Sequence, residues 1–314
     1  MEFGRIEGDV GAVDFRLPPE PEANAAVLAR AAGAPARERG VIRFGLAGWS
    51  DKDFVGTLLP PGTPASEFLR LHARAYTTNE LNTTYYGIDA DRIERWRSAS
   101  PKDFRFCPKL PSGITHGGAL VGVEAEMERF VELVREFGGR LGRAWGLLPI
   151  EFSPRQGPAL EAFVERWARE LPLAFEVRGD AWFRGARDGR NPAFERLCSV
   201  FAEHDVALVL SDVAGRRDVC HMRLTARDAI VRFVGNRPHP TDAVRIDAWA
   251  ERIARWCDAG LQTAHVFVHQ RRDPEAVETT RIFRAAIERA TGRDPLPGFP
   301  SEAEVARGVQ GSFF

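Results

Sequence analysis

The stretch TTNELNTTYYGID, residues 77–89, ends a short run of strand-forming residues in a group of polar and aromatic side chains. A similar stretch, FGLAGWSDKDF at residues 44–54, precedes it. Glu80 and Asn82 lie two positions apart, so on a strand their side chains share one face. Trp49 follows a glycine where the earlier run ends. Because α/β proteins place their sites at such strand ends, the two stretches predict an α/β scaffold with a site.

Short apolar runs of this kind recur along the chain, and amphipathic segments with helical spacing separate most of them. The runs cover residues 43–48, 78–82, 105–110, 144–150, 173–179, 207–212, 229–235 and 265–270. Eight such units match the length of about 250 residues that a (β/α)8 barrel needs. The sequence therefore predicts an α/β fold with a single TIM-like (β/α)8 barrel. An open doubly wound sheet is the alternative, and the absence of a glycine-rich phosphate loop argues against it.

The unit between residues 207 and 229 is expected to be irregular, because the interval leaves little room for a helix. The barrel is expected over residues 41–291. Residues 1–40 form an N-terminal extension, expected to be partly mobile or loosely packed, and residues 292–314 form a C-terminal tail.

The composition excludes several classes of protein. The formal net charge of −1 provides no overall basic field that would draw the chain to nucleic acid or to a membrane. Neither an apolar leader nor a run of about 18 apolar residues occurs, so no membrane segment is expected. The four cysteines form no CxxC pair, which argues against structural zinc and fits reduced core thiols in the cytoplasm.

Several strings then follow one another in order. They are GLAGW (45–49), ELNTTYYG (80–87), the pattern Trp96, Pro101, Phe104, Phe106 and Lys109, ITH (114–116), FEVRGDAWF (175–183), VRFVG (231–235) and VFVHQ (266–270). In these strings the chain resembles the YecE-like family, known as domain of unknown function seventy-two. The resemblance covers nearly all of the chain between the two tails. It implies a TIM-like barrel and no particular reaction, because the activity of that family is not established.

The chain departs from the usual pattern of this family at three polar positions. Gly179 stands where a histidine is frequent, and Val234 stands in place of the histidine of an Arg-x-His-Gly string. His269 and Gln270 replace paired asparagines. The resemblance therefore implies that a chemistry shared by the family would be altered or lost in this chain.

Polar residues near five predicted strand ends are expected to converge on one cleft: Glu80, Asn82, Lys109, Glu176, Arg178, Asp212 and Arg232. Glu176 and Arg178 share a strand face, so they form either an ion pair inside the barrel or an acid beside an anion-binding guanidinium. Asp212 ends a strand and belongs either to the site or to a helix cap. The three cations of this set favour a phosphate or carboxylate ligand.

Histidines and aromatic residues complete the predicted site. His116 is a candidate general acid or base, because its ordinary pKa lies near neutrality. His269 on the last strand is either a ligand contact or a core histidine. Trp49 and Trp182, with Tyr85 and Tyr86, are expected at the rim, where rings stack on a sugar or a base or simply close the barrel.

Neither a metal nor a particular cofactor is predicted, since no HxH or HExxH spacing occurs. Two classes of function compete. One is an enzyme that acts on a small anionic, phosphate-bearing or sugar-like substrate by acid–base or hydrolytic chemistry, and the other is a non-catalytic module that binds a nucleic acid or a protein. Inward-facing carboxylates and the near-neutral charge favour the enzyme. Its catalytic groups would be Glu80, Glu176, Asp212 and His116, and its substrate contacts would be Trp49, Asn82, Lys109, Arg178, Trp182, Arg232 and His269.

Overall fold

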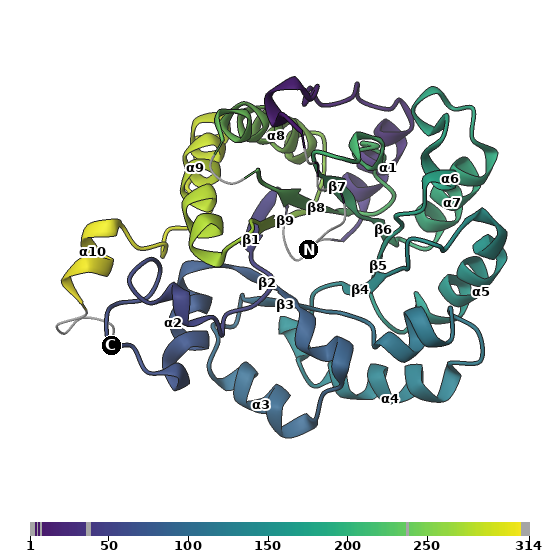
Figure 1. Ribbon diagram of the computed structural model, residues 1–314. Helices are drawn as coiled ribbons and strands as arrows, with labels where there is room; N and C mark the ends of the chain where they lie inside the picture. The colour runs from purple at the N-terminus through teal and green to yellow at the C-terminus, as the bar shows by residue number, and fades with distance from the viewer. Residues whose placement is uncertain (1–3, 5, 7, 36–38, 237–238, 309–314) are drawn as a thin grey trace.

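Parallel strands alternate with helices along the chain. A computed structural model describes residues 4, 6, 8–35, 39–236 and 239–308 (Figure 1). The strands are β1 Val41–Gly45, β2 Thr78–Leu81, β3 Arg105–Pro108, β4 Ala144–Leu147, β5 Leu173–Glu176, β6 Ala207–Leu208, β7 Leu210–Asp212, β8 Asp228–Val234 and β9 Thr263–His269. The helices are α1 Ala23–Gly33, α2 Phe68–Ala75, α3 Ala90–Ser98, α4 Glu124–Arg135, α5 Gly157–Trp167, α6 Asp180–Phe183, α7 Pro192–Glu203, α8 Pro240–Asp258, α9 Asp273–Thr291 and α10 Glu302–Arg307. Figure 1 shows the strands in the middle of the molecule with helices around them.

All described strand pairs are parallel, and they form three hydrogen-bonded sheets with the orders β1-β9-β8-β7, β2-β3 and β4-β5-β6. The first strand therefore lies beside the last. A few backbone hydrogen bonds connect neighbouring sheets, among them those from Glu80 N to Leu46 O (3.0 Å) and from Leu110 N to Trp145 O (2.9 Å). The predicted α/β class with parallel strands is confirmed. The three ladders do not join into one closed sheet, so the predicted closed barrel is not confirmed.

The apolar core has two parts, because alternate residues of a strand face opposite ways. The larger cluster fills the space between strands and helices. The smaller one consists of side chains from several strands that meet one another: Cys107, Trp145, Ala174, Ala207, Val209, Ala226, Ile230 and Phe267. Residues two positions further along these strands lie on the same inner side.

The unit between β6 and β8 is irregular, as the sequence predicts. β6 and β7 occupy one strand position that is interrupted at Val209, and among the described residues only a short turn, Arg217–Val219, stands where a helix would follow. His221 Nε2 lies 3.2 Å from Val209 O, and Leu208 N donates to Thr225 Oγ1 (2.9 Å). The segment after the turn thus supplies hydrogen bonds to the interrupted strand.

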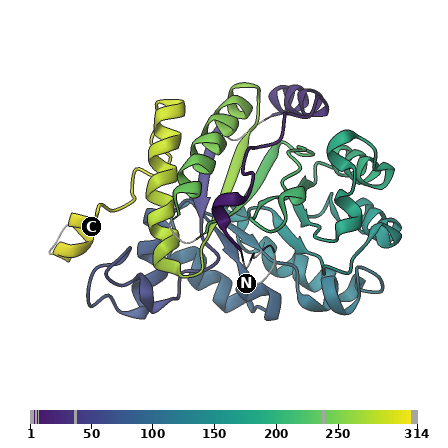
Figure 2. The same cartoon turned by 45° about the horizontal axis from the view of Figure 1, so that its top comes forward.

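Both ends of the described chain carry helices outside the alternating units. α1 is anchored by Asn24, which donates to Met222 O (2.8 Å) and accepts from Leu224 N (2.8 Å). In Figures 1 and 2, α10 stands at one side of the molecule. The predicted domain boundaries at residues 40 and 291 stay predictions. No described helix is both long and apolar enough to span a bilayer.

Candidate functional site

Five polar side chains from five strands meet at the carboxyl ends of the strands: Glu80, Lys109, Glu176, Arg232 and His269, here called the polar layer. Lys109 Nζ lies 2.6 Å from Glu80 Oε1, and His269 Nε2 lies 2.8 Å from Glu80 Oε2. Arg232 Nη1 lies 3.3 Å from Glu176 Oε1. All five residues are buried.

The strand repeat explains why these side chains face one another. Four of them lie two residues beyond a member of the inner apolar cluster: Lys109 follows Cys107, Glu176 follows Ala174, Arg232 follows Ile230 and His269 follows Phe267. Since successive side chains alternate between faces, residues two apart point the same way. The polar layer therefore sits directly on the apolar one.

The charge states within the layer follow from burial and from neighbours. Burial would raise the pKa of Glu80, but Lys109 and His269 hold it well below its ordinary value. Burial lowers the pKa of His269, and Arg232 lowers it further, against the opposing effect of Glu80. At neutral pH the glutamate is thus an anion and the imidazole is neutral. Since a carboxylate only accepts hydrogen bonds, His269 donates through Nε2–H.

Ser211 on β7 is a member of this site that the sequence analysis did not identify. Its hydroxyl donates to Glu176 Oε1 at 3.0 Å, beside the contact of that oxygen with Arg232. The signal that would have found it is the strand repeat, since position 211 shares the face of Ala207 and Val209. Ser211 therefore helps to fix the orientation of the Glu176 carboxylate.

An open pocket of about 440 Å³ lies beside the polar layer, lined by Gly4, His116, Pro149, Ile150, Glu151, Arg178 and Arg216. Arg178 Nε and Nη2 both donate to Leu148 O at 3.2 Å. Burial lowers the pKa of Arg178, Glu176 raises it and Arg232 lowers it again. Arg178 is therefore the residue that connects the pocket with the polar layer.

His116 reaches the pocket from the turn Gly113–Gly117 after β3. Its Nδ1 lies 2.9 Å from Thr115 Oγ1. Partial burial lowers the pKa of His116, and Arg178 adds to that effect. The imidazole is thus neutral at physiological pH and has the protonation state of a general base. Asn82 contributes differently, because its Nδ2 donates to Ala47 O (2.9 Å) and ties two strand-end loops together.

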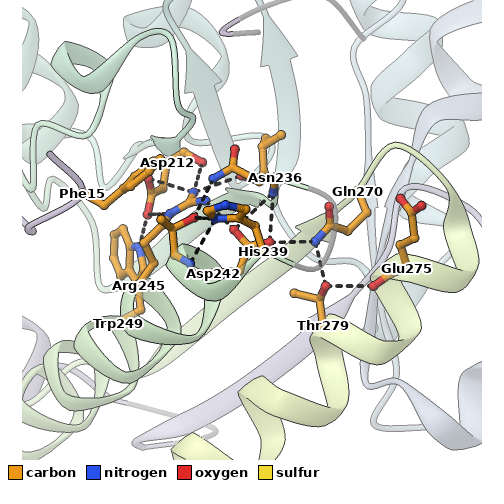
Figure 3. A network of polar contacts seen from close by, with 12 residues as sticks. Phe15, Asp212, Asn236, His239, Asp242, Arg245, Trp249, Gln270, Glu275 and Thr279 are labelled. Carbon is orange, nitrogen blue, oxygen red and sulfur yellow. Dashed lines mark hydrogen bonds and ion pairs between the residues drawn. The ribbon is translucent and has the colours of Figure 1, made fainter. Parts of the chain in front are cut away.

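Asp212 does not lie in this site, so its prediction as a catalytic group is wrong. Its carboxylate is fully buried on the other side of the strand, where it forms ion pairs with Arg217 and with Arg245 (Nη2–Oδ1, 3.0 Å). Trp249 Nε1 also donates to Asp212 Oδ2 at 2.7 Å, as Figure 3 shows. Position 212 shares the face of Leu210, which packs under the helices. The helix-cap alternative is wrong as well, because β7 is followed in the described chain by the short turn Arg217–Val219, whose N-cap residue is Arg216.

The two predicted rim tryptophans also point elsewhere. Trp49 packs edge-on against Trp96, with ring centroids 5.3 Å apart, and lies 6.2 Å from the ring of Phe106. Trp182 is buried in the larger core cluster, and its Nε1 donates to Phe152 O at 2.9 Å. Trp49 lies in the loop after β1 and Trp182 in the short helix α6, where the alternation of a strand no longer predicts direction. The assignment of the buried Trp182 as a substrate contact is therefore wrong, and that of the half-buried Trp49 stays a prediction.

No group of three or more histidine, cysteine, aspartate or glutamate side chains within the described ranges is arranged to hold a metal ion. The fold and the site together define an α/β protein of parallel strands whose polar side chains gather at the carboxyl strand ends. The family model for a protein of unknown function, DUF72, matches residues 43–303, and the chain belongs to this family.

Relatives agree with this assignment. The chain is 27% identical over 256 residues to the UPF0759 protein YecE of Escherichia coli (strain K12), covering 76% of this chain and 91% of that protein. Among solved structures it resembles a crystal structure at 3.10 Å resolution of a DUF72 family protein from Enterococcus faecalis V583, with a TM-score of 0.62 and 20% identity over 79% of this chain and 96% of the other. A second structure of that protein, at 2.52 Å, gives a TM-score of 0.57 and 18% identity over 79% and 98%. These structures support the fold alone.

Proposed function

We propose that the chain is an enzyme that binds a small anionic substrate, phosphate-bearing or sugar-like, in the pocket beside the polar layer. The reaction would be acid–base or hydrolytic. One observation carries the proposal: five titratable side chains from five strands are buried together next to an open pocket. Burying an ion costs several kcal/mol even after relaxation. Apolar side chains fill the layer directly below, so the fold does not require charges between the strands. Titratable groups with perturbed pKa values at a cleft are typical of functional sites.

The residues have distinct roles in this proposal. Arg178 lines the pocket and is held there by its hydrogen bonds to Leu148 O, and a guanidinium matches the oxygens of a phosphate or carboxylate group. His116, neutral and exposed on the same wall, would take a proton from the bound substrate. The ionised Glu80, with Lys109 and His269, would stabilise charge that develops deeper in the site.

Anion-dependent melting tests the proposal. Millimolar sulfate or phosphate should raise the melting temperature of the wild type, because a ligand of the folded state alone stabilises it by mass action. Arg178→Gln should abolish this rise. Arg196→Gln is the matched control, because Arg196 is exposed and pairs with Glu161 on neighbouring helices away from the pocket. An equal rise in both variants would reject the pocket as the anion site.

We also infer that the three sheets are arcs of one (β/α)8 barrel. The pairing of β1 with β9 supports this inference, because doubly wound sheets place the first strand inside the sheet and away from the last. The inner apolar cluster supports it too, since six strands contribute side chains to it. A crystal structure of this chain should show continuous ladders from β1 to β2 and from β3 to β4.

The four free cysteines further support a cytoplasmic location.

A further inference from the structure

We propose that the substrate of this site combines a flat ring with a phosphate group, as in a nucleotide, and that the ring lies on Tyr85 and Tyr86. This inference rests on the proposed function. The two tyrosine rings pack edge to face, with centroids 5.2 Å apart, and Tyr85 meets the ring of His116 at 5.6 Å. Because His116 and Arg178 line the same pocket, the rings form a row that ends at the guanidinium.

Hydrogen bonds to neighbouring strand ends hold the turn that carries the tyrosines, Asn82–Tyr86. Thr84 Oγ1 lies 2.9 Å from Leu81 O and 2.7 Å from Lys109 O, and Asn82 is bonded to Ala47 O. Gly87 ends the turn with a φ of +119°, which a side chain would not tolerate without strain. The tyrosines are thus presented on a fixed support, so little conformational entropy is lost when a ligand stacks on them.

Exposed apolar side chains lie on the loops at the same ends of the strands. Four large apolar side chains are exposed in the described part of the chain, and three of them lie on the loops after β2, β3 and β4. These are Tyr86 (86% exposed), Val121 (65%) and Ile150 (48%), and Ile150 also lines the pocket. Exposed apolar groups gathered at a polar cleft are typical of a binding surface. The fourth, Val244, lies on α8.

The combination of features selects the ligand class. A sugar phosphate without a flat aromatic ring would use the guanidinium and leave the tyrosines uncovered. A protein partner would cover the tyrosines and leave the guanidinium pocket unused. A nucleic acid strand is disfavoured, because the net charge is −1 and the exposed Glu151 lies in the same pocket. A ring joined to one phosphate uses both parts, since stacking on tyrosine is tolerant of ring type and the guanidinium matches the phosphate.

Titration calorimetry with AMP, ribose 5-phosphate and inorganic phosphate tests the inference. The wild type should bind AMP at least about tenfold more tightly than ribose 5-phosphate. Tyr86→Ala should lower the affinity for AMP by about tenfold and leave that for ribose 5-phosphate unchanged, because only the ring contact is removed. Val244→Ala removes another exposed apolar side chain, from α8, and should change neither affinity.

The outcomes separate the two proposals. If all three compounds bind through Arg178 with similar affinity and Tyr86→Ala has no effect, the ring inference is overturned and the proposed function stands. If none of the compounds binds, the proposed function fails and the ring inference fails with it. If Tyr86→Ala changes self-association and not AMP affinity, the tyrosines form a protein contact and the inference is overturned.

Discussion

At the scale of single residues, the carboxylate of Asp212 is the centre of a buried network that joins β7 to α8. Arg245, also fully buried, lies between the rings of Phe15 and Phe233, with its guanidinium carbon 4.7 and 4.2 Å from the ring centres. It also pairs with Asp242 at 3.1 Å (Figure 3). Burial would raise the pKa of Asp212, but Arg245 and Arg217 hold it below its ordinary value. This network fastens α8, and the segment around Phe15, to the strands.

Replacing this carboxylate should destabilise the fold without affecting the pocket. Asp212→Asn removes the negative charge opposite Arg245, and breaking a buried ion pair on one side costs about 3–5 kcal/mol. Chemical denaturation measures the loss. Asp247→Asn breaks an exposed pair with Arg289 and should cost less than about 1 kcal/mol. If Asp212→Asn has normal stability but no longer binds anions, the structural role of Asp212 is contradicted and the residue belongs to the functional site.

The same residues show how far the sequence predicts the site. Glu80, Glu176 and Arg232 were predicted from the strand repeat, which continues to the last residue of a strand. Asp212 was assigned to the wrong face, although the repeat places it with Leu210 on the helix side. Trp49 lies beyond its strand, where no repeat exists, so its direction could not be predicted.

At the scale of the elements, the apolar runs predicted the strands closely. β1 begins two residues before the predicted run at residue 43, and β9 begins two residues before the run at residue 265. The interruption at Val209 was not predicted, because its cause is the contact with a distant loop that contains His221. Hydrogen bonds between segments far apart in the chain leave no local pattern. Local periodicity therefore predicts where a strand lies and not whether it is continuous.

The start of α9 provides a test of stability against pH. Partial burial raises the pKa of Asp273 to about 6, and the Asp51 carboxyl adds to this shift. A carboxyl whose folded pKa is raised stabilises the fold below its unfolded pKa of about 3.9, and that contribution is lost as the pH rises through about 6. Asp273→Asn should therefore be more stable than the wild type at pH 7.5, by about 1 kcal/mol after allowance for solvent screening.

Denaturation curves at two pH values measure this effect. The advantage of Asp273→Asn should be absent at about pH 3, where the wild-type carboxyl is largely protonated in both states. An advantage of the same size at both pH values would contradict the raised pKa of Asp273 as the cause and point to helix packing instead.

At the scale of the whole molecule, the side chains between the strands form layers. The polar layer lies at the carboxyl ends, the apolar cluster lies below it, and a second polar group lies at the opposite ends of the strands. There Arg143 pairs with Asp228 (2.9 Å) and Asp205 (3.1 Å), near the buried His265. The largest side chains of the apolar cluster, Trp145 and Phe267, meet at 5.3 Å. One apolar layer thus separates two charged regions.

Removing the largest member of this layer should weaken the whole fold. Trp145→Ala leaves a cavity between the two charged regions and should cost about 3–5 kcal/mol in urea unfolding. Trp145→Phe keeps most of the volume and removes an indole N–H that has no hydrogen-bond partner among the described residues. It should therefore cost far less. Equal losses in both variants would contradict a cavity as the cause.

The position of Gly4 has a practical consequence. Its carbonyl oxygen accepts a hydrogen bond from Gly215 N at 2.7 Å, and Gly4 itself lines the pocket. An affinity tag fused ahead of Gly4 would leave the molecule at the pocket mouth and compete with any compound under test. A tag placed after α10, which stands at one side of the molecule in both views, avoids this interference (Figures 1 and 2). Ligand screens on this protein should therefore use carboxyl-terminal tags or tags that are cleaved off.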